Sequence, residues 1–216
     1  MAKTTAPLLS FDARGQIAKT QVYAAWKGRS YVRRYVIPAN PQSTDQTLTR
    51  DTFTWLNNTW KVAPGDFRSA WTLAAKGQVL TDRNLWIKKN LSILRELAAL
   101  TGIVLSPGAR GGLIGDITVT PGNDQITVAG VPPDPLPPGW SVVRMIAAVI
   151  RDQDPQSGTL YDIEVMDDAT DPYSVIFTGL VSATTYFAGA WFEYQKSALA
   201  TDLAYGPSVG ESALTT

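Results

Sequence analysis

The chain has 216 residues, its 19 Lys and Arg balance 19 Asp and Glu, and it contains neither His nor Cys. This composition excludes disulfides, thiol catalysis, Ser-His-Asp catalysis and the Cys or His sites that hold zinc. An apolar content of 44 % is typical of a globular protein. No apolar run reaches the roughly 18 residues of a membrane helix, and the first residues lack the apolar core of a signal peptide. We therefore expect a soluble product made in a cytoplasm.

The neutral total hides a strong division of charge along the chain. Residues 1–115 carry 16 Lys and Arg against 6 Asp and Glu, a net charge of +10, and residues 116–216 carry 3 against 13, a net charge of −10. The change falls in a Gly-rich segment that lacks the Gly-Lys-Ser/Thr ending of a phosphate-binding loop. We expect a basic α+β domain at 1–106, a hinge at 107–115 and an acidic β-sandwich domain at 116–216.

Two strands open the basic half. Runs of β-branched and aromatic residues predict strands over 20–26 and 30–37, joined by a turn in which Gly28 takes a positive φ. Arg33 and Arg34 should point to opposite faces, because side chains alternate along a strand. Two interpretations stay open: a hairpin solvated on both sides, or a ribbon that packs on another protein through its Tyr and Arg side chains.

Three helices should follow, over about 44–61, 65–76 and 82–100. The first should begin at a capping box of Ser43 and Gln46, Gly77 should end the second, and Thr81 or Asp82 should cap the third. The helix stripe Phe53, Leu56 and Trp60 indicates an apolar face. We expect the core of this half to contain its five tryptophans, Trp26, Trp55, Trp60, Trp71 and Trp86.

The acidic half alternates like an all-β domain, with short predicted strands separated by turns over residues 117–194. The segment 179–186, with a Leu six residues before Tyr186, resembles the tyrosine corner of fibronectin type III domains. Tyr186, Ala188, Ala190, Phe192 and Tyr194 would then share one face of the next strand. The family's usual Trp in the second strand is missing, and Ile126 or Val128 stands in its place.

No group of residues indicates catalysis, so we expect no enzyme, no catalytic residue and no cofactor. Paired carboxylates of a glycan hydrolase are the last of the alternatives. The densest carboxylates favour a solvated acidic edge over a calcium site, because the EF-hand pattern is absent; they are Asp162, Glu164, Asp167, Asp168 and Asp171. Basic residues interleaved with aromatic ones, from Lys19 to Arg50, could also bind nucleic acid, although the attached −10 half would repel phosphates.

The motifs ARGQI at 13–17, YVRRYV at 31–36 and PANPQS at 38–43, followed by Gln46 and Arg50, resemble a group of tailed-bacteriophage virion proteins over about residues 11–100. The resemblance implies a non-enzymatic structural protein of the particle, located in the virion and without a membrane. Our first expectation is a capsid decoration (cement) protein, anchored by the basic domain with the sandwich projecting outward. A tail or head–tail connector protein is the alternative, and a nucleic-acid-binding module is the second alternative. The implied partners are the major capsid protein or another virion protein, with homo-oligomers on the particle. The expected capsid-binding residues are Arg14, Tyr31, Arg33, Arg34, Tyr35 and Arg50.

Overall fold

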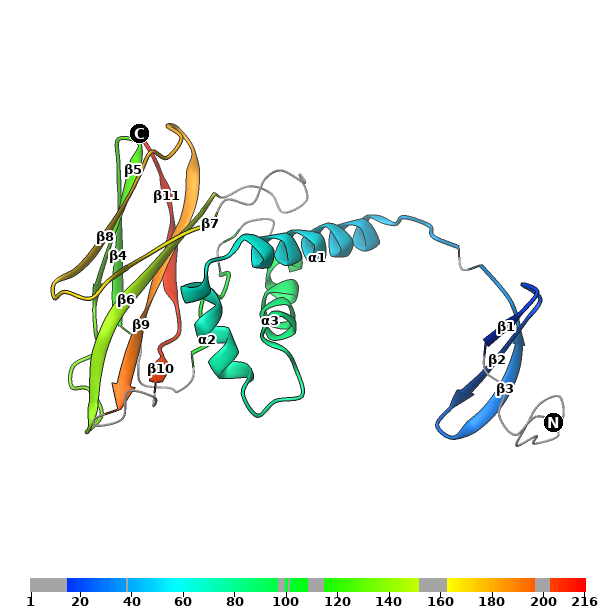
Figure 1. Cartoon of the computed structure of the whole chain (residues 1–216). Helices are drawn as coiled ribbons and strands as arrows, with labels where there is room; N and C mark the ends of the chain where they lie inside the picture. The colour runs from blue at the N-terminus through cyan, green and yellow to red at the C-terminus, as the bar shows by residue number, and fades with distance from the viewer. Residues whose placement is uncertain are drawn as a thin grey trace. The chain divides into compact units, whose positions relative to one another are not determined.

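The computed structural model describes residues 15–37, 39–96, 100, 102–108, 115–151, 163–196 and 203–216. Contacts divide the chain into two compact units, Met1–Gln42 and Ser43–Thr216. Figure 1 labels the helices and strands of both. Within the described residues, no helix is long and apolar enough to cross a membrane.

The first unit contains a three-stranded antiparallel sheet, which we call the N-terminal sheet. Its strands are β1 (Gly15–Ile17), β2 (Gln21–Trp26) and β3 (Arg29–Arg34), in the order β1-β2-β3. A two-residue turn joins β2 to β3, and both of its residues have positive φ, 49° at Lys27 and 73° at Gly28. Such turns match the right-handed twist of paired strands. The predicted hairpin and the positive φ of Gly28 are confirmed.

The second unit begins with the three expected helices, α1 (Thr44–Val62), α2 (Gly65–Ala75) and α3 (Asp82–Glu96). Gly77 follows α2 with a φ of 82°, and the Thr81 hydroxyl caps α3 by accepting a 3.3 Å bond from the Asn84 amide. The predicted capping box is wrong. The Ser43 side chain makes no capping bond, because the first turn of α1 closes through the Ser43 carbonyl, which accepts from the Gln46 amide at 2.9 Å.

The buried face of α1 also differs from the predicted stripe. Leu56 and Trp60 are buried as expected, but Phe53 is 44 % exposed and Trp55 takes its place in the core. Thr52 and Thr59 complete the buried face, and each donates its hydroxyl to the carbonyl four residues earlier. These internal bonds allow polar side chains to lie in an apolar interface.

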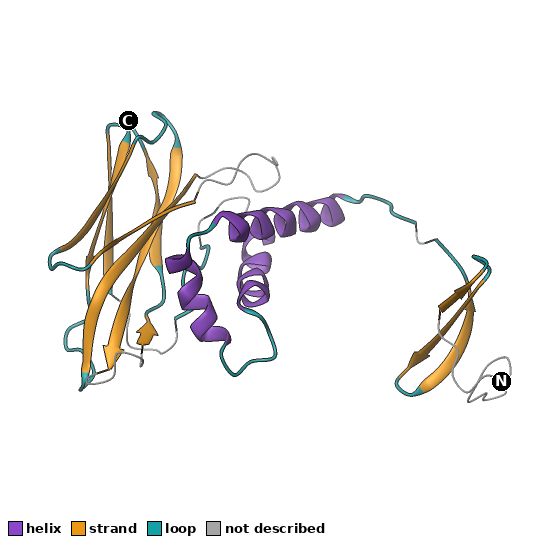
Figure 2. Ribbon diagram, viewed as in Figure 1, coloured by secondary structure: helices purple, strands orange, loops and turns teal. Residues whose placement is uncertain are grey.

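Two antiparallel sheets follow, drawn in orange in Figure 2. The first has the order β4-β5-β8, and the second has the order β7-β6-β9-β10 with β11 also paired to β9. The strands are β4 (Asp116–Gly122), β5 (Gln125–Val131), β6 (Trp140–Arg151), β7 (Ile163–Asp168), β8 (Tyr173–Thr178), β9 (Thr185–Lys196), β10 (Leu203–Tyr205) and β11 (Val209–Leu214). Their inner faces pack together around Ile126, Val128 and Phe177, all fully buried. This arrangement is a β-sandwich.

The central strands β6 and β9 are buried on both faces. Alternate residues of β6, such as Met145 and Ala147, face the interior of the sandwich, whereas Ile146 and Ala148 belong to a second core that includes Trp71 and residues of all three helices. The helices therefore cover the outer face of the second sheet (Figure 1). A strand covered on both faces has a continuous apolar sequence, which explains the run from Met145 to Ile150.

This shared core groups the residues differently from the expected domains at 1–106 and 116–216. The helices and the sandwich form one unit, and the unit boundary lies after Gln42. In the expected hinge at 107–115, residues 109–114 lie outside the described residues. The residues just before it are tied to the sandwich: the Leu105 amide donates to the Ser208 hydroxyl at 2.9 Å, and the Ser106 hydroxyl donates to the Gly206 carbonyl at 2.8 Å.

Candidate interaction site

The N-terminal sheet leaves its large apolar side chains in solvent. Among the described residues of its unit, Tyr23 alone is buried. Trp26, which we had expected in a core, is 67 % exposed, and Tyr31 is 41 % exposed. Three short strands with so little buried surface gain little stability by themselves. Exposed aromatic side chains in such a setting are typical of a surface that binds another molecule.

The same segment has a strongly positive charge. Residues 15–44 contain five Lys and Arg and no Asp or Glu, so the segment supplies no carboxylate of its own to neutralise them. The five are Lys19, Lys27, Arg29, Arg33 and Arg34. A partner with carboxylate or phosphate groups would be attracted to this segment.

Strand register gathers aromatic and basic side chains on one face of the sheet. The pairs Ala24↔Tyr31 and Trp26↔Arg29 place Tyr31, Arg29 and Trp26 on one side. Arg33 lies on this side too, two residues after Tyr31. The Lys27 ammonium sits 4.9 Å from the centre of the Trp26 ring, a cation–π contact beside this face. We call Trp26, Arg29, Tyr31 and Arg33 the aromatic-basic face.

The six expected capsid-binding residues do not all belong to this face. Tyr31 and Arg33 do, Arg34 points to the opposite side of β3, and Tyr35 is half-buried after the strand, where its amide donates to the Thr20 carbonyl at 2.8 Å. Arg50 lies on α1 in the other unit.

Arg14 lies outside the described residues. The expected capsid-binding set omitted Trp26 and Arg29. The signal for Arg29 was available in the sequence, because Arg29, Tyr31 and Arg33 alternate at the spacing that places side chains on one face of a strand.

Strand β3 is also an edge. Within the described residues it pairs only with β2, so its other side offers backbone N–H and C=O groups for a further strand. An edge of this kind can bind an extended segment by strand addition, in which backbone hydrogen bonds supply affinity and the side chains supply specificity.

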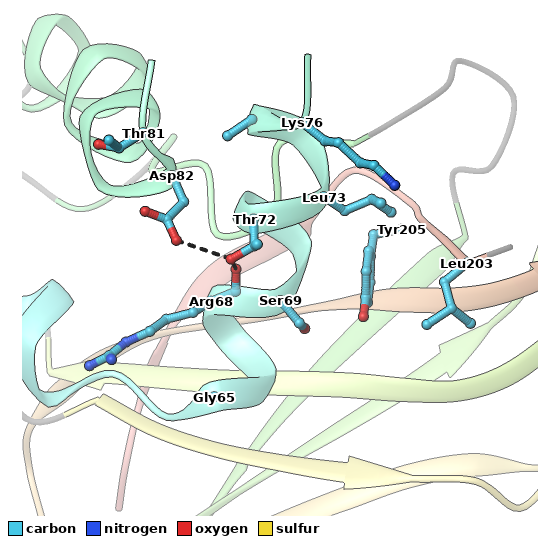
Figure 3. Close-up of a pocket in the computed structure, with 11 residues that line it drawn as sticks. Gly65, Arg68, Ser69, Thr72, Leu73, Lys76, Thr81, Asp82, Leu203 and Tyr205 are labelled. Carbon is cyan, nitrogen blue, oxygen red and sulfur yellow. Dashed lines mark hydrogen bonds between the residues drawn. The ribbon is translucent and has the colours of Figure 1, made fainter. Parts of the chain in front are cut away.

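The second unit has a groove of about 770 Å³ between α2 and β10, shown in Figure 3. Leu73, Leu203 and Tyr205 make up its apolar part. Burial raises the pKa of the Tyr205 hydroxyl, which keeps it neutral. The Thr72 hydroxyl is held by the Asp82 carboxylate at 3.0 Å. Asp82 is the one carboxylate among the described lining residues.

Carboxylates of the predicted acidic edge serve structural contacts. Asp167 accepts a 2.9 Å bond from Arg144, and the two oxygens of Asp168 accept from the amides of Thr170 and Ser174, both at 2.9 Å. Asp162 lies outside the described residues. Within the part of the chain that is described, no three acidic side chains gather as a metal site requires.

The predicted tyrosine corner is present. The Val181 amide donates a 3.0 Å hydrogen bond to the Tyr186 hydroxyl. Tyr186 is the second residue of β9, and the alternate residues Ala188 and Phe192 lie with it in the core of the sandwich, as predicted. A corner of this kind at the start of the sixth sandwich strand is a mark of immunoglobulin-like and fibronectin-like sandwiches.

Comparisons with known proteins found no protein-family model that matches the sequence and no curated protein that matches it. Solved structures that are similar to part of the chain include two β-sandwich domains. A redesigned β-sandwich protein is similar over 48 % of this chain and 90 % of its own, with 23 % identity and a TM-score of 0.33. The fibronectin type III domain of human collagen alpha-1(XX) chain is similar over 51 % of this chain and 92 % of its own, with 13 % identity and a TM-score of 0.35. The assignment of a fibronectin-like sandwich rests on the strand order and the tyrosine corner of the chain itself.

Proposed function

We propose that this chain is a non-enzymatic structural protein of a phage particle, which decorates the capsid exterior and attaches to it through the N-terminal sheet. The observation that carries the proposal is a sheet with a charge of +5 over residues 15–44 that exposes Trp26 and Tyr31. Exposed aromatic side chains do not stabilise an isolated monomer, and they are typical of a surface that binds a partner. The virion setting comes from the resemblance of residues 11–100.

Weak individual contacts are sufficient when many copies attach to the same particle. One short sheet offers a small binding surface, but identical chains on a symmetric shell add their contacts through avidity. The unit of residues 43–216 has its own two cores and would be held at the surface as a folded body.

The experiment is retention on purified particles after reversal of two charges. We expect the Arg33→Glu/Arg34→Glu chain to lose attachment and to keep the far-UV spectrum of the wild type. The matched control is Arg83→Glu/Lys88→Glu, which makes the same change of charge at exposed positions of α3. Equal occupancy of the Arg33/Arg34 variant and the wild type would overturn the proposal. Labelled protein found on the tail instead of the shell would select the connector alternative.

Nucleic acid is the second candidate, because the aromatic-basic face combines cations for phosphates with rings on which bases could stack. A phosphate-based complex weakens by orders of magnitude as salt rises, whereas apolar packing is insensitive to screening. We expect negligible affinity for duplex and single-stranded DNA at physiological salt, with particle binding retained. Submicromolar DNA affinity at that salt, with no particle binding, would favour the second candidate.

A further inference from the structure

Two segments of this chain have complementary charges. Residues 15–44 carry five basic and no acidic side chains, and residues 152–195 carry no basic and eight acidic side chains, of which Asp167 and Glu193 pair with Arg144. Within the described residues, the first segment contains the edge strand β3 and the second contains the edge strand β7. Each of these strands pairs with one neighbour only, β2 and β6 respectively.

We propose that β3 of one copy of this chain adds to the free edge of β7 in a second copy, so that copies associate head to tail. This inference rests on the proposed function, since it takes the N-terminal sheet as the docking element. The new element is that the free edge of β3 binds a neighbouring copy of the chain. In this pairing the side chains of β3 on one face contact the neighbouring copy, while Trp26 on β2 and Arg34 on the opposite face stay open for contact with a shell.

One antiparallel register matches the side chains of the two strands. With Arg33 opposite Glu164, Tyr31 stands opposite Met166 and Arg29 stands opposite Asp168, because opposite residues step two at a time along both strands. All three pairs then lie on one side of the joined sheets. Opposite charges across two strands stabilise the pairing, and a Met sulfur beside an aromatic ring adds a favourable contact.

Exposure of these residues fits the register. Arg29, Arg33 and Glu164 are exposed, and Tyr31 and Met166 are each 41 % exposed. Asp168 is half-buried. Its carboxylate accepts two backbone bonds and retains acceptor capacity for a guanidinium, since an ionised carboxylate has about four lone-pair sites.

Pairing of like edges is disfavoured by the same charges. Two β3 strands would bring arginines together, and two β7 strands would bring carboxylates together, which is destabilising when the charges are opposite one another. The favoured contact therefore joins two different patches. Such a heterologous contact produces rings or open chains of copies, as an array on a particle surface requires.

The test is sedimentation of the full chain as a function of concentration, with two single charge reversals and their mixture. We expect the wild type to self-associate, and Arg33→Glu and Glu164→Arg each to weaken the association by about tenfold or more. An equimolar mixture of the two variants should associate again, because the altered β3 of one matches the altered β7 of the other. Recovery in the mixture also demonstrates that both variants are folded.

A wild type that stays monomeric at every concentration would overturn the inference, and so would association that both reversals leave unchanged. The particle assay separates this result from the proposed function. Glu164→Arg leaves the N-terminal sheet intact, so it should bind particles while failing to self-associate. If the wild type binds particles but does not self-associate, the inference fails and the proposed function stands. If the wild type self-associates but reversal of Arg33 and Arg34 leaves its attachment to particles unchanged, the proposed function fails and the inference stands.

Discussion

Asp66 at the start of α2 and Arg144 on β6 form an ion pair of 2.9 Å, although they are 78 residues apart in the sequence. The same guanidinium contacts Asp167 at 2.9 Å and Glu193 at 2.5 Å. Burial disfavours the charge of Arg144, but its bonds to Glu193 and Asp167 outweigh this effect and raise its pKa. One arginine thus ties the helical layer to three strands and neutralises Glu193, which is almost fully buried.

Replacement of that arginine should be strongly destabilising. We expect Arg144→Met to lower the free energy of unfolding by about 3 kcal/mol, because Glu193 would remain buried without a positive charge to neutralise it. Asp66→Asn is the matched control and should cost under about 1 kcal/mol, since the Asp66 side chain is half exposed. Urea unfolding of the variants measures both values. Equal losses of stability in the two variants would show that the Arg144–Asp66 pair, and not the buried Glu193 carboxylate, determines the destabilisation.

Stability should decline at alkaline pH. Burial raises the pKa of Tyr194, Tyr205 and Tyr173 above the ordinary value of 10.0, and at Tyr173 nearby Asp171 adds to the effect. Above pH 10 the unfolded chain loses these protons while the folded chain keeps them, so unfolding is favoured as the pH rises. Each such tyrosine contributes a slope of about 1.4 kcal/mol per pH unit.

Urea midpoints measured upward from neutral pH should therefore stay constant until about pH 10 and then fall. The variant Tyr194→Phe should show a smaller decline than the wild type. Ultraviolet absorbance of tyrosinate gives an independent measurement. If all tyrosines ionise with an ordinary pKa in the folded protein, the explanation fails.

The second unit should fold without the first. A chain of residues 43–216 keeps both apolar cores, so its thermal midpoint should equal that of the second unit in the full chain. Limited proteolysis should cut first in residues 39–43, which are exposed and lack regular structure. A first cut in residues 107–115 would favour instead the division expected from the charge pattern.

The tyrosine corner should contribute a measurable part of the sandwich's stability. We expect Tyr186→Phe to cost about 1 kcal/mol, because it removes the acceptor of the Val181 amide. The control Tyr31→Phe removes a hydroxyl from the exposed N-terminal sheet and should leave the unfolding of the second unit unchanged. Chemical unfolding followed by the fluorescence of the buried tryptophans reports on that unit.

Much of the local structure could be predicted because its signals are local. The turn at Gly28, the end of α2 at Gly77 and the cap of α3 at Thr81 depend on residues within one turn of the chain. The tyrosine corner was predictable for the same reason, since Val181 and Tyr186 are five residues apart. The capping role of Ser43 failed because a matching spacing permits that bond without requiring it.

The candidate site was predictable only in part. The arginines and tyrosines of β3 could be identified from the sequence, but the exposure of Trp26 could not, because tryptophan is highly buried on average. Arg50 was grouped with them because it is near in sequence. The helix that carries it belongs to the other compact unit.

By itself the sequence determined most of the elements: three helices, a β-hairpin and a set of alternating strands that form a sandwich, together with the division of charge. The strands β1, β10 and β11 were not predicted. Tertiary structure alone decided that the helices pack on β6 and β9 and that the boundary between the compact units lies after Gln42 in the chain. The physical reason is that periodicity reports which face of an element is apolar, but not which partner covers it. The continuous apolar runs of β6 and β9 required a second covering layer, and only the folded chain reveals that Trp71 and Trp86 supply it.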